Sequence, residues 1–227
     1  MKRLALTFPI PFALLPSRQR RFARADVERL TDVMSRVVVV CLFSMMAVRF
    51  GADFLKTGRV TGLLLLVSEL LVVVLTVMRR SAATIDRSMR ARTLTVVSML
   101  APLFLKPASV VALVPQFATV AMSVAGLGIM IAGKMTLGRS FGLMPANRGI
   151  VSSGVYRVVR HPIYLGYLVT HAAYLAGMPS VWNVVTLVCG DVALLARAVC
   201  EERTLARDAR YRDYQQVVRW RVCPGVF

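Results

Sequence analysis

Long apolar stretches separated by short basic segments dominate the pattern of this 227-residue chain. Six such stretches occupy residues 33–54, 60–78, 93–105, 108–133, 163–178 and 181–199. A helix needs about 20 apolar residues to cross the hydrocarbon core of a bilayer, with some tolerance for tilt. The pattern therefore predicts an all-α integral membrane protein with six transmembrane helices. Because the third and fifth stretches are short, five or seven crossings remain alternatives, and Lys106-Pro107 could form a tight turn or the break of a re-entrant hairpin.

Composition agrees with a bilayer environment. The chain is 57% hydrophobic, and its mean hydropathy of +0.64 is too high for a domain whose surface must be largely polar. The formal net charge of +18 would also suit a nucleic-acid partner, because clustered Lys and Arg displace counterions from phosphates. Here the basic residues lie between apolar runs, so we expect membrane lipids as partners and no nucleic acid.

The distribution of the 29 basic residues predicts the orientation. Seven precede residue 33, five lie in 79–92, five in 134–160 and six after residue 200. In a six-span chain these four regions share one side, and only Lys56, Arg59 and Lys106 lie in the opposite turns. The positive-inside rule therefore predicts that both the N- and C-termini are cytoplasmic.

We expect one compact domain with three parts: a basic interfacial N-terminal arm (1–32), the first four transmembrane helices (33–133) and a catalytic part that includes a cytoplasmic cap (134–227). The first fifteen residues superficially resemble a secretion signal. Prolines interrupt that stretch, and arginines stand where small cleavage-site residues would be needed. An arm on the membrane surface is therefore the preferred interpretation.

Cysteine and histidine content argues against a metal site. Cys41, Cys189, Cys200 and Cys223 form no CxxC pair, so neither a disulfide framework nor a zinc knuckle is indicated, and we expect reduced thiols. The chain has only two histidines, which excludes a histidine-rich metal site. We therefore expect no metal ligands.

Ionisable residues inside apolar spans are costly and are candidates for function. Glu69 could accept from a substrate, or it could pair with Arg36 or Arg49 between helices. Asp191 allows the same two interpretations, and His171 is interpreted as a packing residue. A membrane scaffold or transport-related protein, with Glu69, Arg49 and Asp191 along a polar path, is the non-enzymatic alternative.

A glycine-rich segment precedes the fifth apolar stretch. Glycines at 138, 142, 149 and 154 come before Tyr156, and Arg160-His161-Pro162 then opens an apolar helix. The N-terminus of a helix favours the carboxylate of a small ligand, and His161 and Tyr164 would project beside it. Taken alone, this segment is either a helix cap or a cofactor pocket.

A second polar cluster lies at the end of the last span. Arg197 and Glu201 are four residues apart, so they share a helix face. They form either an exposed pair of little energetic value or a pair that points into one cavity. Because Arg197 follows an apolar run, its guanidinium is expected to be partly dehydrated and in need of an anionic partner.

Together these clusters resemble the isoprenylcysteine carboxyl methyltransferase family, which shares its motifs with membrane phospholipid methyltransferases. The matching residues are Gly154-Val155-Tyr156, Arg160-His161-Pro162-Ile163-Tyr164-Leu165-Gly166, Glu201-Glu202, Tyr211, Tyr214, Arg221 and Pro224. Three features depart from the family: a short loop at 141–148, Arg148 in place of a small residue or His, and a short segment between Glu202 and Tyr211. The resemblance covers the C-terminal two-fifths of the chain.

The resemblance implies a membrane methyltransferase that uses S-adenosyl-L-methionine. It implies that the cofactor is held by Arg148, Gly149, Ile150, Val151, Tyr156, His161, Pro162, Ile163, Tyr164 and Glu201. It also implies that Arg197 meets the acceptor and acts with Glu201 in catalysis. We accordingly predict that the start of the fifth helix and the end of the sixth converge around one chamber.

The chemistry of methyl transfer suits these residues. Transfer from a sulfonium is an in-line displacement, which requires alignment in a water-poor pocket. A carboxylate acceptor is already ionised, so Arg197 would position it without a general base, whereas an amine would lose a proton to Glu201 or Glu202. Because a site at the cytoplasmic rim of the fifth and sixth spans can open sideways between helices, we expect a hydrophobic, lipid-like acceptor there, and Arg197 favours a carboxylate. Phospholipid N-methylation and methylation of a small thiol or acid are alternatives, and the oligomeric state stays open.

Overall fold

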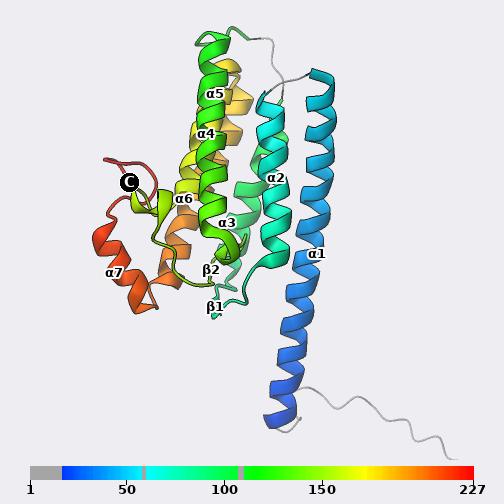
Figure 1. Ribbon diagram of the computed structural model, residues 1–227, viewed down its shortest axis with the longest axis vertical. Coiled ribbons are helices and arrows are strands. Elements are labelled where there is room, and N and C mark those ends of the chain that lie inside the picture. The colour runs from blue at the N-terminus through cyan, green and yellow to red at the C-terminus, as the bar shows by residue number, and fades with distance from the viewer. Residues whose placement is uncertain (1–16, 58–59, 107–109) are drawn as a thin grey trace, which may run out of the picture.

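The apolar stretches fold into helices in the computed structural model, which describes residues 17–57, 60–106 and 110–227 (Figure 1). The helices are α1 (Ser17–Thr57), α2 (Val60–Met78), α3 (Met89–Leu100), α4 (Gln116–Leu137), α5 (Pro162–Gly177), α6 (Val181–Leu205) and α7 (Ala209–Val217). Short 3-10 turns lie at η2 (Ala101–Phe104), η3 (Gly138–Ser140) and η4 (Gly154–Arg157). The all-α fold is confirmed.

Several helices are long and apolar enough to span a bilayer. Three helices among the described residues meet the criteria of length and composition, at Arg36–Lys56, Gln116–Ser140 and Val181–Leu205. Leu63–Met78 is a shorter apolar helix. With α3 and α5, which have 12 and 16 residues, they form the helices expected of a multi-pass membrane protein. All four cysteines are free thiols.

The first helix is longer than the first apolar stretch. α1 runs without interruption for 41 residues and includes 17–32, which the sequence assigned to the interfacial arm. Residues 1–16 of that arm lie outside the described part of the chain. The division of the chain into three parts stays a prediction.

The fourth helix corrects two boundaries. An apolar span was expected over 108–133, but the helix begins only at Gln116, after Pro115 in extended conformation. It continues to Leu137, so Lys134, which the charge count assigned to a cytoplasmic segment, lies inside α4 and is 1% exposed. Its Nζ donates to Ser68 Oγ at 2.6 Å and to the Ser68 carbonyl at 3.2 Å. The proposed break at Lys106-Pro107 involves residue 107, which is outside the described residues.

A close crossing of α4 and α5 fixes the position of the fifth helix. A Cβ added to Gly166 would lie 2.6 Å from the carbonyl oxygen of Gly126, and one added to Gly126 would lie 2.8 Å from that of Gly166. Only glycine allows backbones to approach this closely. The crossing holds the first turn of α5 against the core, which includes Leu127, Met130 and Ile163.

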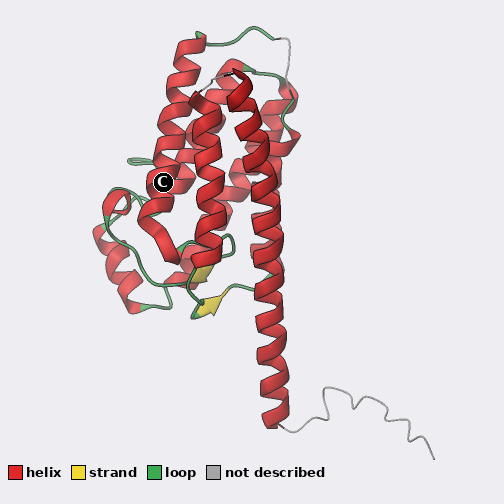
Figure 2. Ribbon diagram, turned by 45° about the vertical axis from the view of Figure 1, so that its right-hand side comes forward, coloured by secondary structure: helices red, strands yellow, loops and turns green. Residues whose placement is uncertain are grey.

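The segment before α3, the glycine-rich loop and α7 gather at one end of the bundle. There a two-residue ribbon pairs β1 (Thr84–Ile85) antiparallel with β2 (Ala146–Asn147), with Thr84 opposite Asn147. Figures 1 and 2 show this ribbon at the same end of the bundle as α7. We call this end the cap; it comprises residues 79–88, 138–161 and 206–227.

Candidate active site

One cavity runs from the cap into the helical bundle. Its volume is about 1080 Å³, and residues of all seven helices line it. Its polar end is lined by Tyr156, His161, Tyr164, Arg197 and Glu201, the five residues that the sequence places around one chamber. The opposite walls are apolar and include Leu42, Phe43, Met46, Leu65, Leu127 and Met130. The structure thus brings the two predicted clusters together.

The first turn of α5 supplies two stacked rings. Pro162 begins the helix and His161 precedes it as the N-cap residue, as the sequence predicts. The imidazole of His161 stacks on the ring of Tyr164, with 5.1 Å between centroids and 17° between planes. Backbone N–H groups of Arg160 and His161 donate to the carbonyls of Trp220 and Arg221 at 3.0 and 2.7 Å. The C-terminal tail therefore holds these rings in place.

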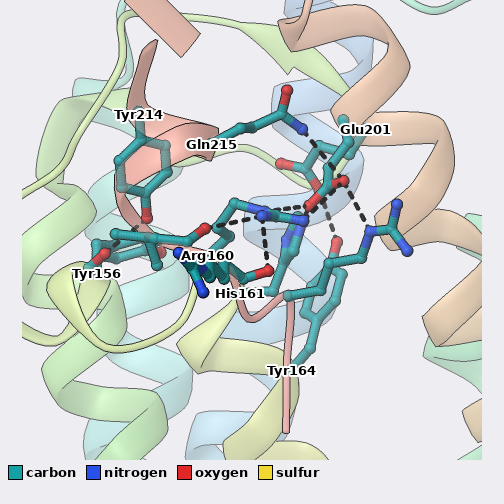
Figure 3. Close-up of polar contacts among 11 residues, drawn as sticks. Tyr156, Arg160, His161, Tyr164, Glu201, Tyr214 and Gln215 are labelled. Atoms are coloured by element: carbon teal, nitrogen blue, oxygen red, sulfur yellow. Dashed lines mark hydrogen bonds and ion pairs between the residues drawn. The ribbon is translucent and has the colours of Figure 1, made fainter. Parts of the chain in front are cut away.

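Glu201 and Tyr164 form the hydrogen bond at the centre of the polar end. The Tyr164 hydroxyl donates to Glu201 Oε2 at 2.8 Å, which Figure 3 shows with the two side chains facing each other. Tyr164 comes from α5 and Glu201 from the last turns of α6. This bond joins the two helices at the cavity wall.

Arg197 lies one helical turn before Glu201 and is only 6% exposed. Its guanidinium lies over the ring of Tyr164, 5.4 Å from the centroid, and one terminal N–H donates to the Leu143 carbonyl. Its Nε is buried and has no hydrogen-bond partner. Arg197 and Glu201 are both described residues, and no ion pair within 4.0 Å joins them. The exposed, self-neutralising pair is therefore excluded, and a buried donor is left for a ligand.

The glycine-rich loop forms another wall. Arg148, Gly149, Ile150 and Val151 all line the cavity, whereas Pro162 does not. Gly149 has a φ of +106°, a left-handed conformation that favours glycine. Its N–H donates to Asn147 Oδ1 at 3.0 Å, and Asn147 Nδ2 donates to Asp208 Oδ2 at 3.0 Å. The hydrogen bond from Asn147 lowers the pKa of Asp208, which also caps α7. The loop is therefore anchored to α7.

Two tyrosines of α7 close the cap side of the cavity. Tyr211 and Tyr214 line it, and the Tyr214 hydroxyl donates to the Tyr156 carbonyl at 2.6 Å. Burial raises the pKa of Tyr214 to about 12. Burial, with Glu201 nearby, raises the pKa of Tyr156 well above its usual value. Both phenols therefore stay neutral near pH 7, and the Tyr214 hydroxyl acts as a hydrogen-bond donor.

Glu202 has a different role from its neighbour Glu201. It is 4% exposed and accepts from Arg160 Nε at 2.7 Å and Arg221 Nε at 2.9 Å, while His161 Nε2 lies 3.3 Å away. Consecutive helical residues point about 100° apart, so Glu201 faces the cavity and Glu202 faces the tail. The sequence motif contains Arg160 and Arg221, but their structural role was not predicted.

Two ionisable residues in the spans, His171 and Glu69, differ from expectation. His171 is not only a packing residue, because its Nδ1 lies 2.6 Å from Asp191 Oδ1 between α5 and α6. The ion pair of Glu69 with Arg36 or Arg49 is wrong: Arg36 donates to the Val77 carbonyl, and Arg49 is exposed. Glu69 instead lines the cavity.

Comparisons with known proteins agree with this geometry. Residues 106–210 match the sequence model of a family described as phospholipid methyltransferase. A protein of Arabidopsis thaliana, named Protein-S-isoprenylcysteine O-methyltransferase A, is 35% identical over 100 residues, which are 41% of this chain and 45% of that protein. The match thus spans less than half of that relative's length.

The matched region coincides with the site. It contains α4, the glycine-rich loop, α5 and α6, and with them every residue predicted to bind the cofactor or the acceptor. The resemblance stated from the sequence is confirmed. Residues 106–210 are therefore similar to the phospholipid methyltransferase family, whose members are membrane enzymes that use S-adenosylmethionine.

Proposed function

We propose that this chain transfers a methyl group from S-adenosylmethionine to a hydrophobic, lipid-like acceptor at the cytoplasmic face of the membrane. The observation that carries the proposal is the single cavity that joins a polar end at the cap to an apolar chamber among the helices. A small polar ligand and an apolar chain can meet in such a space. Its apolar walls exclude water, as displacement at a sulfonium requires.

The residues of the polar end suit the cofactor. S-adenosylmethionine supplies a methyl group on a positively charged sulfonium. A carboxylate and aromatic faces attract a cation, and Glu201, Tyr164 and Tyr156 provide both. The residues that would hold the cofactor are Arg148, Gly149, Ile150, Val151, Tyr156, His161, Ile163, Tyr164 and Glu201, whereas Pro162, outside the cavity lining, would only start the helix that positions them.

Arg197 would bind the acceptor. Its buried Nε has no partner, so an anionic oxygen of the acceptor would satisfy it and be oriented by it. This favours a carboxylate, which is consistent with the O-methylation in the name of the Arabidopsis relative and needs no general base. Phospholipid N-methylation remains the second candidate because of the family match, with Glu201 as base because Glu202 is bonded to two arginines.

The acceptor proposal predicts dependence on an apolar tail. The purified protein, with methyl-labelled cofactor, should methylate N-acetyl-S-farnesyl-cysteine with a kcat/KM about a hundredfold above that of N-acetyl-S-methyl-cysteine, because the tail is removed from water in the apolar chamber. If dioleoyl phosphatidylethanolamine is offered as the acceptor instead, label in the extracted lipid would identify phospholipid methylation. Equal turnover of the tailed and tail-less cysteines, without lipid labelling, contradicts a lipid-like acceptor.

We further propose that six helical segments cross the membrane, α1, α2, α3 with η2, α4, α5 and α6, with both termini and the cap in the cytoplasm. The basic segments 79–92 and 200–227 lie at the cap end, which supports this orientation. In a variant without native cysteines, a cysteine replacing Met89, 71% exposed at the cap end, should resist an impermeant maleimide added to intact cells. One replacing Val111, 89% exposed, should react. The reverse labelling pattern contradicts the orientation.

A further inference from the structure

The outer side of the cap exposes apolar side chains that do not belong to the membrane-spanning helices. Val217 and Val226 are 82% and 84% exposed, and Val158 and Trp220 are exposed as well. Exposed apolar side chains on the spans face lipid, but in the cap they would face water. An exposed apolar surface among charged residues is typical of a contact site. The outer side of the cap therefore requires a partner.

Two faces of α7 have different surroundings. Tyr211 and Tyr214 are buried and line the cavity. Arg210, Asp213 and Val217 have the spacing of three and four residues that places them together on another face, and all three are exposed. The helix therefore forms part of the cavity wall and part of the cap surface at the same time.

Residues of α7 and of the segment before α5 enclose a surface pocket of about 460 Å³. Arg157 and Arg210 line it together with Ser152, Asp213 and Val217. Within the part of the chain that the structure describes, neither guanidinium forms a hydrogen bond or an ion pair. Two such cations, beside one carboxylate and an exposed valine, suit a phosphate group that is attached to an apolar chain.

The charge and the position of the cap indicate which partner carries this phosphate. The cap contains twelve arginines and three aspartates, and no lysine or glutamate. Such a surface is attracted to the anionic phospholipids of a cytoplasmic leaflet. Figures 1 and 2 both show the C-terminal end of the chain between the levels of the two ends of α4. The tail thus returns from α7 along the side of the bundle, where it would meet lipid headgroups.

The elements that form this surface also close the cofactor end of the cavity. The backbone N–H groups of Arg160 and His161 donate to the carbonyls of Trp220 and Arg221 at 3.0 and 2.7 Å, while the side chain of Trp220 is exposed. The buried tyrosines of α7 line the same end of the cavity. A ligand that holds the outer side of α7 and the tail would therefore also hold their inner side in place.

We propose that the outer face of the cap, formed by Arg157, Val158, Arg210, Val217 and Trp220, docks on the membrane surface and binds anionic phospholipid headgroups. This contact holds α7 and the tail against the cofactor end of the cavity, so that cofactor affinity depends on the lipid composition of the membrane. The dependence of cofactor affinity rests on the proposed function, whereas the lipid contact does not.

Fluorescence of Trp220 tests the lipid contact. The chain has two tryptophans, so W182F leaves Trp220 as the single emitter. In nanodiscs of equal amounts of dioleoyl phosphatidylcholine and dioleoyl phosphatidylglycerol, dibrominated chains on the phosphatidylglycerol should quench Trp220 on the order of fivefold more than the same chains on the phosphatidylcholine. If W182F does not fold, the difference between wild type and W220F gives the same signal.

Two charge-matched variants locate the contact. R157Q/R210Q should remove the preference for brominated phosphatidylglycerol. R90Q/R92Q removes the same charge from exposed arginines of α3, outside the cap, and should keep the preference. An equal loss of preference in both variants would show a general effect of net charge and would overturn the site.

Binding of S-adenosylhomocysteine tests the link to the cavity. Calorimetric titration of wild type should give an affinity about fivefold higher in nanodiscs that contain phosphatidylglycerol than in pure phosphatidylcholine. R157Q/R210Q should bind equally in both, with the wild-type affinity in phosphatidylcholine, which shows that it is folded. Glycerol 3-phosphate added to phosphatidylcholine nanodiscs should not raise the affinity. If it does, the pocket binds a soluble phosphate, and docking on the membrane is overturned.

The failures of this inference and of the proposed function are distinguishable. Equal quenching by the two brominated lipids overturns the lipid contact, and an affinity that does not depend on phosphatidylglycerol overturns the link to the cavity. In both cases, methyl transfer by wild type upholds the proposed function. A wild type that binds no S-adenosylhomocysteine in either nanodisc overturns the proposed function and the link, while selective quenching by phosphatidylglycerol would still support the lipid contact.

Discussion

Replacing Glu201 with alanine should lower kcat/KM for methyl transfer about a hundredfold and weaken binding of S-adenosylhomocysteine about tenfold. Glu201 lines the polar end of the cavity, and its Oε2 accepts the Tyr164 hydroxyl at 2.8 Å. The substitution removes the carboxylate that would face the sulfonium, and it leaves a buried hydroxyl without a partner. The charge effect should fall on turnover more than on product affinity, because S-adenosylhomocysteine is not a sulfonium.

Two matched variants separate charge from hydrogen bonding at this position. E201Q keeps the shape and an acceptor for Tyr164, so it should bind S-adenosylhomocysteine nearly as wild type does and still lose most turnover. Y164F keeps the carboxylate and should retain most turnover. Kinetics with labelled cofactor and calorimetric titration measure both quantities. An E201A protein with wild-type turnover would show that Glu201 is not part of the catalytic site.

Hydropathy and helix-start signals located most helices because both are local properties. The stretch at 60–78 has the same bounds as α2, and Pro162, which the sequence placed at the start of the fifth helix, is the first residue of α5. The start of α4 was missed because residues 110–114 are as apolar as the helix that follows, and only Pro115 marks the change. The β1–β2 ribbon has two-residue strands, too short for a period-two pattern.

Helix periodicity and the motif predicted which side chains meet, but not which partner each one takes. The spacing of Arg197 and Glu201 placed both on one cavity wall, as the structure has them. Their actual partners, the Leu143 carbonyl and the Tyr164 hydroxyl, lie 54 and 37 residues away in the chain. Such contacts depend on how loops and helices pack. Lys134 is a similar case, because a hydropathy profile cannot show that Ser68 receives its ammonium inside the bundle.

Replacing Glu202 with alanine should lower the free energy of unfolding much more than replacing Glu201 with alanine. E202A removes the carboxylate that binds Arg160 and Arg221 and leaves the 8% exposed guanidinium of Arg160 without its anionic partner. Breaking a buried ion pair from one side typically costs about 3–5 kcal/mol. An unpaired hydroxyl, as in E201A, costs about 1–3 kcal/mol. The free energy of unfolding, measured by denaturant titration in mild detergent, should fall more for E202A.

The loss of stability in E202A should also affect the active site, because the C-terminal tail holds the first turn of α5 in place. Arg160 also donates to the carbonyls of Val218 and Arg219, and the His161 N–H donates to the Arg221 carbonyl, so this cluster holds the rings of the first turn of α5. E202A should thus weaken S-adenosylhomocysteine binding in parallel with stability. Arg219 offers the control: its side chain is exposed and R219A keeps the backbone carbonyl, so this variant should match wild type. An E202A protein as stable as R219A would show that the tail is held by its backbone hydrogen bonds and not by this carboxylate.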